Sequence, residues 1–169
     1  LLGIGGGMLM VPFMTLLLSA KGMPPELIIK MAIATSLATI CFTSIASVRA
    51  HHQRGAVVWT IVRRLAPGIV LGSLLGAQIA KALPAPLLSL LFGAFVAFSA
   101  TQMLLDRKPR ATRQLPPPAG MFAAGGVVGL LAALAGAGGA FVSVPFMTWC
   151  NVKIHNAVAT SAALGFPIA

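Results

Sequence analysis

The sequence predicts an all-α fold, namely a polytopic helical membrane protein built from two homologous repeats of about four helices, the second truncated here. Of the 169 residues, 58% are hydrophobic and only 8% are charged, whereas a soluble domain carries about 25% charged residues. Long apolar segments separate the charges, and a motif near the start of the chain returns in its last third. So few charged side chains cannot cover a soluble surface, which excludes a soluble enzyme or a cytosolic binding module.

Three apolar segments have the length of a simple membrane crossing, which needs about 20 residues of helix. They comprise residues 27–48, 56–80 and 87–105. Arg63 and Arg64 fall in the first third of the second segment, where long side chains can reach the membrane interface. We interpret residues 1–18 as the end of an earlier helix and residues 154–169 as the start of a later one.

The segment 119–150 is uncharged and, at about 1.5 Å per residue, too long for one straight crossing. Glycines and Pro145 interrupt it, which predicts a broken helix or a re-entrant hairpin. If the glycine-rich segments cross fully, the two repeats are parallel; if they turn back, the repeats are inverted. We expect full but broken crossings.

The basic residues predict the orientation, because cytoplasmic loops are enriched in Lys and Arg. Four cations lie between Arg49 and Arg64, and four between Arg107 and Arg113. The other four, at other segment ends, are Lys21, Lys30, Lys81 and Lys153. We therefore place the two richer loops in the cytoplasm.

Self-similarity is the strongest signal in the chain. The segment GIGGGMLMVPFMT (3–15) returns as GAGGAFVSVPFMT (136–148), and AIATSLA (32–38) returns as AVATSAA (157–163). Two matched motifs in the same order indicate a duplicated membrane unit. We predict a first repeat at 1–105 with an incomplete first helix, a basic, Pro-rich cytoplasmic linker at 106–118, and the start of a second repeat at 119–169. A complete second repeat requires roughly 95–100 further residues, given the spacing of the paired motifs.

Glycine clusters followed by proline are costly inside a membrane helix, because they free backbone groups. One use for such a break is to direct N–H groups and a helix dipole toward an anion. Close helix packing is the alternative, but the recurrence of Gly and Pro at one spacing favours the anion site. The hydroxyls of the ATS motifs either bind substrate or bond back to their own helix.

The remaining glycines have simpler interpretations. Gly68, Gly72 and Gly76, like Gly125 and Gly129, are spaced by four residues, which favours helix packing. Neither a Walker-type phosphate loop nor a dinucleotide fingerprint is present in the sequence.

The rest of the composition excludes several chemistries. Glu26 and Asp106 are the only acids, so no intramembrane carboxylate can relay protons or bind a cation. The sequence has no metal-ligand spacing, and Cys41 and Cys150 lie in apolar runs. We expect no catalytic residues, no metal and no cofactor. The basic clusters lack interleaved aromatic residues, so we expect no nucleic-acid partner.

The motifs resemble those of the TauE/SafE family, the sulfite exporter-like permeases of the plasma membrane. The resemblance rests on the glycine-rich segments with VP, the ATS motifs, and HHQRGAVVW (51–59) with its downstream glycines. Ala140 stands where the first repeat has a third consecutive glycine, so the two half-sites are not equivalent.

The resemblance implies about eight helices in two halves, in the bacterial inner membrane, and export of a small anion such as sulfite, sulfoacetate or thiosulfate. The alternative is a non-transporting scaffold or a sulfur-transfer subunit of a larger complex. We expect as partners a small anion, the lipid bilayer and possible further copies of the chain in a homo-oligomer. The substrate-binding residues that follow from the motifs are Gly3, Gly5, Gly6, Gly7, Pro12, Thr35, Ser36, Gly136, Gly138, Gly139, Pro145, Thr160 and Ser161.

Overall fold

A computed structural model describes residues 7–104, 115–136 and 138–169 of the chain. The described residues form seven α-helices and contain no strand, which confirms the all-helical prediction. Three helices are long and apolar enough to cross a membrane, by length and composition, among the described residues: Pro25–Gln53, Trp59–Ala82 and Pro118–Ala135. In chain order the helices are α1 (Gly7–Ala20), α2 (Pro25–Gln53), α3 (Trp59–Ala82), α4 (Ala85–Leu104), α5 (Pro118–Ala135), α6 (Ala140–Trp149) and α7 (Ile154–Ile168).

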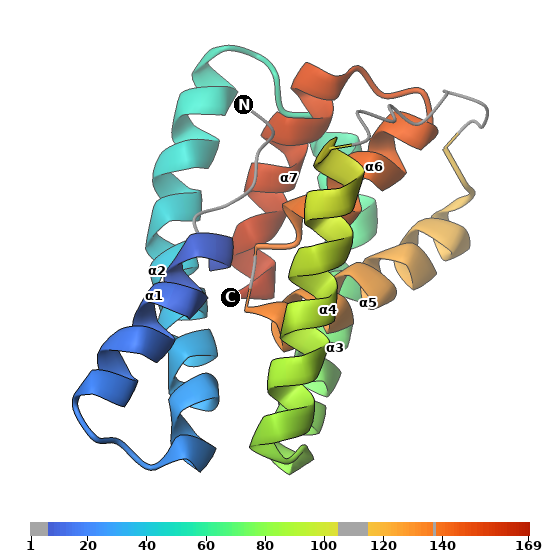
Figure 1. Ribbon diagram of the computed structural model, residues 1–169. Helices are drawn as coiled ribbons and strands as arrows, with labels where there is room; N and C mark the ends of the chain where they lie inside the picture. The colour runs from blue at the N-terminus through green and yellow to red at the C-terminus, as the bar shows by residue number, and fades with distance from the viewer. Residues whose placement is uncertain (1–6, 105–114, 137) are drawn as a thin grey trace.

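Short connections make successive helices antiparallel. In Figure 1, α1 runs downward, α2 upward, α3 downward and α4 upward. Proline occupies the first position of both α2 and α5, where its missing N–H costs nothing. α2 extends five residues beyond the predicted 48, so His51 and His52 lie in its last turn rather than in a loop.

The expected full crossing of 119–150 is not what the structure contains. α5 ends at Ala135, and the chain then turns so that α6 runs back toward the end of the molecule at which α5 began (Figure 1). At 10 residues, or about 15 Å, α6 covers half of a bilayer core. The segment is therefore a hairpin with one short arm.

Because of this reversal, the two paired motifs run in opposite directions. α1 descends and is followed by an ascending α2, while α6 ascends and is followed by a descending α7 (Figure 1). The reversal also moves Lys153, which precedes α7, to the end that carries the α2–α3 connection. Lys153 therefore lies at the same end of the molecule as Arg49 and Arg54, and not at the opposite, less basic end.

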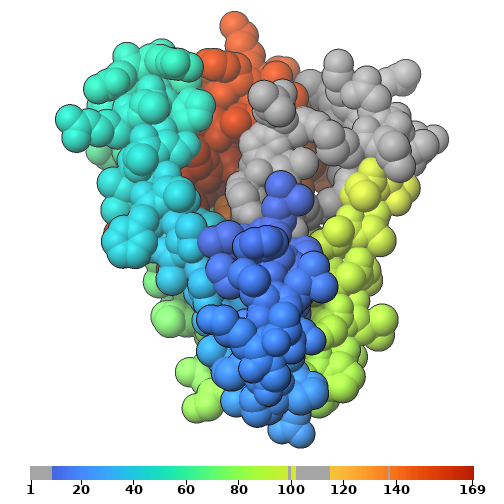
Figure 2. Space-filling model, turned by 60° about the vertical axis from the view of Figure 1, so that its left-hand side comes forward, coloured from blue at the N-terminus to red at the C-terminus, as the bar shows by residue number. Residues whose placement is uncertain are grey.

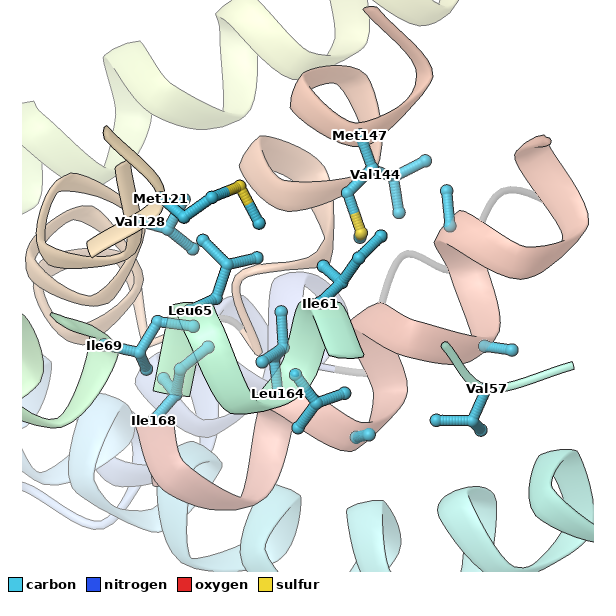
Figure 3. Close-up of a cluster of buried hydrophobic side chains, with 14 of the residues drawn as sticks. Val57, Ile61, Leu65, Ile69, Met121, Val128, Val144, Met147, Leu164 and Ile168 are labelled. Atoms are coloured by element: carbon cyan, nitrogen blue, oxygen red, sulfur yellow. The ribbon is translucent and has the colours of Figure 1, made fainter. Parts of the chain in front are cut away.

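Two buried clusters hold the helices together. The larger one joins α3 to α5, α6 and α7 through side chains such as Leu65, Met121, Met147 and Leu164 (Figure 3). The smaller one joins α1, α2 and α4, with Val11, Ile33 and Leu88 at its centre. Figure 2 shows α1 on the outside of the molecule, between α2 and α4. The first four helices therefore do not share one core, since α3 packs with the helices of the predicted second repeat.

The contact between α3 and α5 depends on glycine. A Cβ atom added at Gly68 or Gly72 would lie closer than 3.0 Å to the backbone of Phe122 or Gly126. Added at Gly125 or Gly129, it would meet the α3 carbonyl oxygens of Leu65 or Ile69 equally closely. The packing interpretation of the four-residue glycine spacing is confirmed.

Candidate functional site

Each glycine-rich segment is followed by a short helix. Gly3, Gly5 and Gly6 lie outside the described residues, and Gly7 is the first residue of α1. In the second segment, Gly136, Gly138 and Gly139 form the turn between α5 and α6. Both short helices begin near mid-height in Figure 1 and then run to opposite ends of the molecule. The two motifs thus place two helix N-termini near the middle of the fold.

The paired prolines accept the same local hydrogen bond. Pro12 and Pro145 each lie within a short helix, and in each case the threonine three residues later donates to the proline carbonyl. The Thr15 Oγ1 to Pro12 O distance is 2.7 Å, and the Thr148 Oγ1 to Pro145 O distance is 3.0 Å. The similarity between the motifs therefore extends from sequence to side-chain geometry.

The α5–α6 turn requires glycine at two positions. Gly136 (φ 58°) and Gly139 (φ 68°) adopt the left-handed conformation, which L-residues with a Cβ avoid. A Cβ at Gly136 would lie 3.2 Å from Ile33 of α2, and one at Gly139 would lie 2.6 Å from Ile168 of α7. The turn is therefore packed between the two helices that carry the ATS motifs.

Ser36 connects the two motifs directly. Its hydroxyl is fully buried and donates to the carbonyl oxygen of Gly136 at 2.7 Å. The first ATS motif thus contacts the second glycine-rich segment across 100 residues of sequence. The structure brings these two predicted site residues together.

The second ATS motif is also buried, with different partners. Ser161 Oγ accepts a hydrogen bond from Ser143 Oγ of α6 at 2.9 Å. Thr160 Oγ1 accepts one from the backbone N–H of Val58, just before α3, at 3.0 Å. Ser143 was missed from the sequence, because the corresponding residue in the first repeat is the apolar Met10. The signal that could have found Ser143 is that no other residue between 119 and 147 carries a hydroxyl.

Thr35 differs from its counterpart Thr160. The Thr35 side chain is exposed and donates to the Met31 carbonyl one turn earlier, at 2.8 Å. Thr160 is completely buried. The two predicted half-sites therefore have unequal environments in the described residues.

Lys30 and His52 make their hydrogen bonds near helix ends rather than at the turn. Lys30 Nζ donates to the Lys81 carbonyl at 3.0 Å, pairing one of the last carbonyls of α3. Trp59 Nε1 donates to His52 Nδ1 at 3.2 Å at the opposite end. Among the described residues, no group of three His, Cys, Asp or Glu side chains could hold a metal ion.

This arrangement can attract an anion. The first N–H groups of α6 have no acceptor within their own helix and carry the positive end of its dipole. The Ser143–Ser161 pair adds hydroxyls close by in sequence and structure. Glu26, the one acid among the described residues, is exposed at the start of α2.

Comparison with known proteins points to transport. A family model described as Sulfite exporter TauE/SafE matches residues 1–169. A probable membrane transporter protein of Haemophilus influenzae is 35% identical over 98% of this chain. Probable membrane transporter proteins of Methanocaldococcus jannaschii (MJ0441) and Bacillus subtilis (YdhB) are each 27% identical, over 97% and 99% of this chain.

The relatives are longer than this chain. The match spans 63% of the Haemophilus influenzae protein, 61% of the Methanocaldococcus jannaschii protein and 69% of the Bacillus subtilis protein. No solved structure shows significant similarity to this chain.

Proposed function

Since this chain belongs to the sulfite exporter TauE/SafE family of multi-pass plasma-membrane transporters, we propose that it moves a small anion through a site between the two repeats. The substrate class we propose is a sulfur oxyanion or organosulfonate, such as sulfite, sulfoacetate or thiosulfate. In this proposal the route passes the α5–α6 turn, next to Ser36 and Ser161.

The observation that carries this proposal is the placement of two short helices. α1 and α6 start near mid-height, each after a glycine-rich segment, and run in opposite directions (Figure 1). Interrupted helices whose N-termini face a central site are a recurrent way to bind anionic groups in transporters with inverted repeats. The N-terminus of α6 lies between α2 and α7, next to Ser36 and Ser161.

Electrostatics supports the sign of the substrate. The described helices carry no carboxylate near the turn, so nothing there repels an anion or attracts a metal cation. A tetrahedral or trigonal oxyanion offers several acceptor atoms, which suits the N–H groups of a helix N-terminus together with hydroxyl donors.

The test is an efflux measurement on the full-length protein in liposomes. Vesicles loaded with sulfite, sulfoacetate, thiosulfate or chloride are compared with protein-free vesicles, with and without a pH gradient. We expect selective efflux of at least one sulfur anion. Absence of flux for all four anions, from protein shown to be folded, would favour the scaffold or sulfur-transfer alternative.

Two variants locate the site, and two matched variants control for it. Ser161→Ala removes a buried α7 hydroxyl that accepts a hydrogen bond from Ser143 of α6, and Gly139→Ala disturbs the turn. Ser89→Ala and Gly93→Ala make the same changes at exposed positions of α4. We expect the first two to reduce sulfur-anion flux at least tenfold and the α4 variants to transport normally. Equal flux in all four would place the site elsewhere.

A further inference from the structure

The two ATS helices correspond in sequence but differ in what covers them. At an offset of 125 residues, Thr160, Leu164 and Pro167 of α7 pair with Thr35, Thr39 and Phe42 of α2. Each set lies on one side of its helix, because the residues are three or four apart. We name the set Thr35, Thr39 and Phe42 the α2 threonine face.

On α7, this side is where α3 packs. Thr160 Oγ1 accepts from Val58 N–H at 3.0 Å, and Ser73 Oγ of α3 lies 3.5 Å from the Pro167 carbonyl oxygen. Leu164 is fully buried in the cluster that contains Ile61 and Leu65 of α3 (Figure 3). α3 and Val58, the residue just before it, therefore contact all three positions of this set.

On α2, no helix of the described residues covers the corresponding side in this way. Phe42 is 76% exposed, Thr35 is exposed and Thr39 is partly exposed. The two threonine hydroxyls donate to the carbonyls of Met31 and Thr35 within α2, at 2.8 and 2.9 Å. Their oxygen lone pairs remain free to accept a backbone N–H, as Thr160 does.

The packing of α3 against α7 suggests which helix would cover the α2 threonine face. α3 follows α2 in the chain yet packs on α7, the counterpart of α2. Because the paired motifs run in opposite directions, the same exchange in reverse would place the helix that follows α7 onto α2. The last turn of α7 lies against α2, since a Cβ added at Gly165 would lie 3.3 Å from Ser44 Cβ, so such a helix would begin beside α2.

We propose that the α2 threonine face is the docking surface for a helix supplied by the second repeat, from residues that follow Ala169 in the full-length protein. The relatives, of which this chain matches 61–69%, have the additional length that such a helix needs. A backbone N–H at the start of that helix donates to Thr35 Oγ1, and apolar side chains cover Phe42. This arrangement is independent of which anion is carried.

Photo-crosslinking of the full-length protein in membranes tests the proposal. A benzophenone amino acid replaces Phe42, and the matched control replaces Phe98, which is 61% exposed on α4. We expect the probe at 42 to crosslink within the chain to a peptide C-terminal to residue 169, identified by mass spectrometry, and the probe at 98 not to do so. Crosslinking of position 42 to lipid alone, or to a second copy of the chain, would overturn the proposal.

A second measurement addresses the hydrogen bond. Thr35→Val and Thr160→Val each remove the acceptor of a backbone N–H while keeping the shape of the side chain. Both should lower the melting temperature of the full-length protein by about 2–4 °C. Thr101→Val is the control, because Thr101 is exposed on α4 and bonds only to the Ala97 carbonyl. A Thr35→Val protein as stable as the Thr101→Val protein would contradict the proposed bond.

Discussion

The α3–α5 contact and the α5–α6 turn both depend on glycine, for different physical reasons. Between α3 and α5, glycines in ordinary helical conformation let two backbones approach so closely that a Cβ would meet a carbonyl. In the turn, Gly136 and Gly139 supply left-handed backbone conformations that end one helix and start another. The first use fixes two helices against each other, and the second reverses the chain. In a membrane protein, glycine content alone therefore does not distinguish rigid packing from a break.

The largest expected effect is at the α3–α5 contact. Gly72→Ala places a Cβ against the backbone of Gly126, which cannot move aside as a flexible side chain could. We expect a loss of about 2–3 kcal/mol in the free energy of unfolding, since overpacked sites cost this much. Thermal unfolding in detergent measures it, and an unchanged transition would show that the two helices separate without strain.

A smaller effect is expected in the turn. Gly139→Ala forces an L-residue into a left-handed conformation, at about 1–2 kcal/mol. The neighbouring atom is the end of the Ile168 side chain, which can rotate away. Gly22→Ala is the matched control, with φ 70° and no atom within 4 Å. If both variants lose the same stability in thermal unfolding, the packing of the turn contributes nothing.

Removing the hydrogen bond between Ser36 and Gly136 should lower the free energy of unfolding by a still smaller amount. Ser36→Ala leaves the buried Gly136 carbonyl without its side-chain donor, which costs about 1 kcal/mol. The free energy of unfolding, with Ser89→Ala as the exposed control, measures this. A Ser36→Ala protein as stable as its control would mean that the turn is held by packing alone.

The smallest effect is expected at Gly93, a glycine that neither permits close helix packing nor adopts a left-handed conformation. Gly93 lies in α4 with an ordinary φ, and no atom lies within 4 Å of the position that a Cβ would take. Gly93→Ala should be neutral or should stabilise the helix by up to about 1 kcal/mol, because alanine is the better helix former. A destabilised protein would reveal a partner at this position of α4.

Much of the candidate site could be predicted from the sequence. The repeated glycine and proline positions located the α5–α6 turn, and the ATS motifs located buried hydroxyls at Ser36, Thr160 and Ser161. Ser143 was missed, because it has no polar counterpart in the first repeat. The prediction that the second glycine-rich segment crosses fully was wrong, because its apolar length fits a broken crossing and a hairpin equally well.

The sequence by itself determined the membrane class, the helical segments, the duplicated motifs and the family, since each depends on composition, length or local pattern. Only the tertiary structure decided that the second segment turns back, that α3 packs with the second repeat, and that Ser36 bonds to Gly136 rather than to its own helix. Those outcomes depend on which distant surfaces fit together, and a local pattern carries no information about a partner 100 residues away.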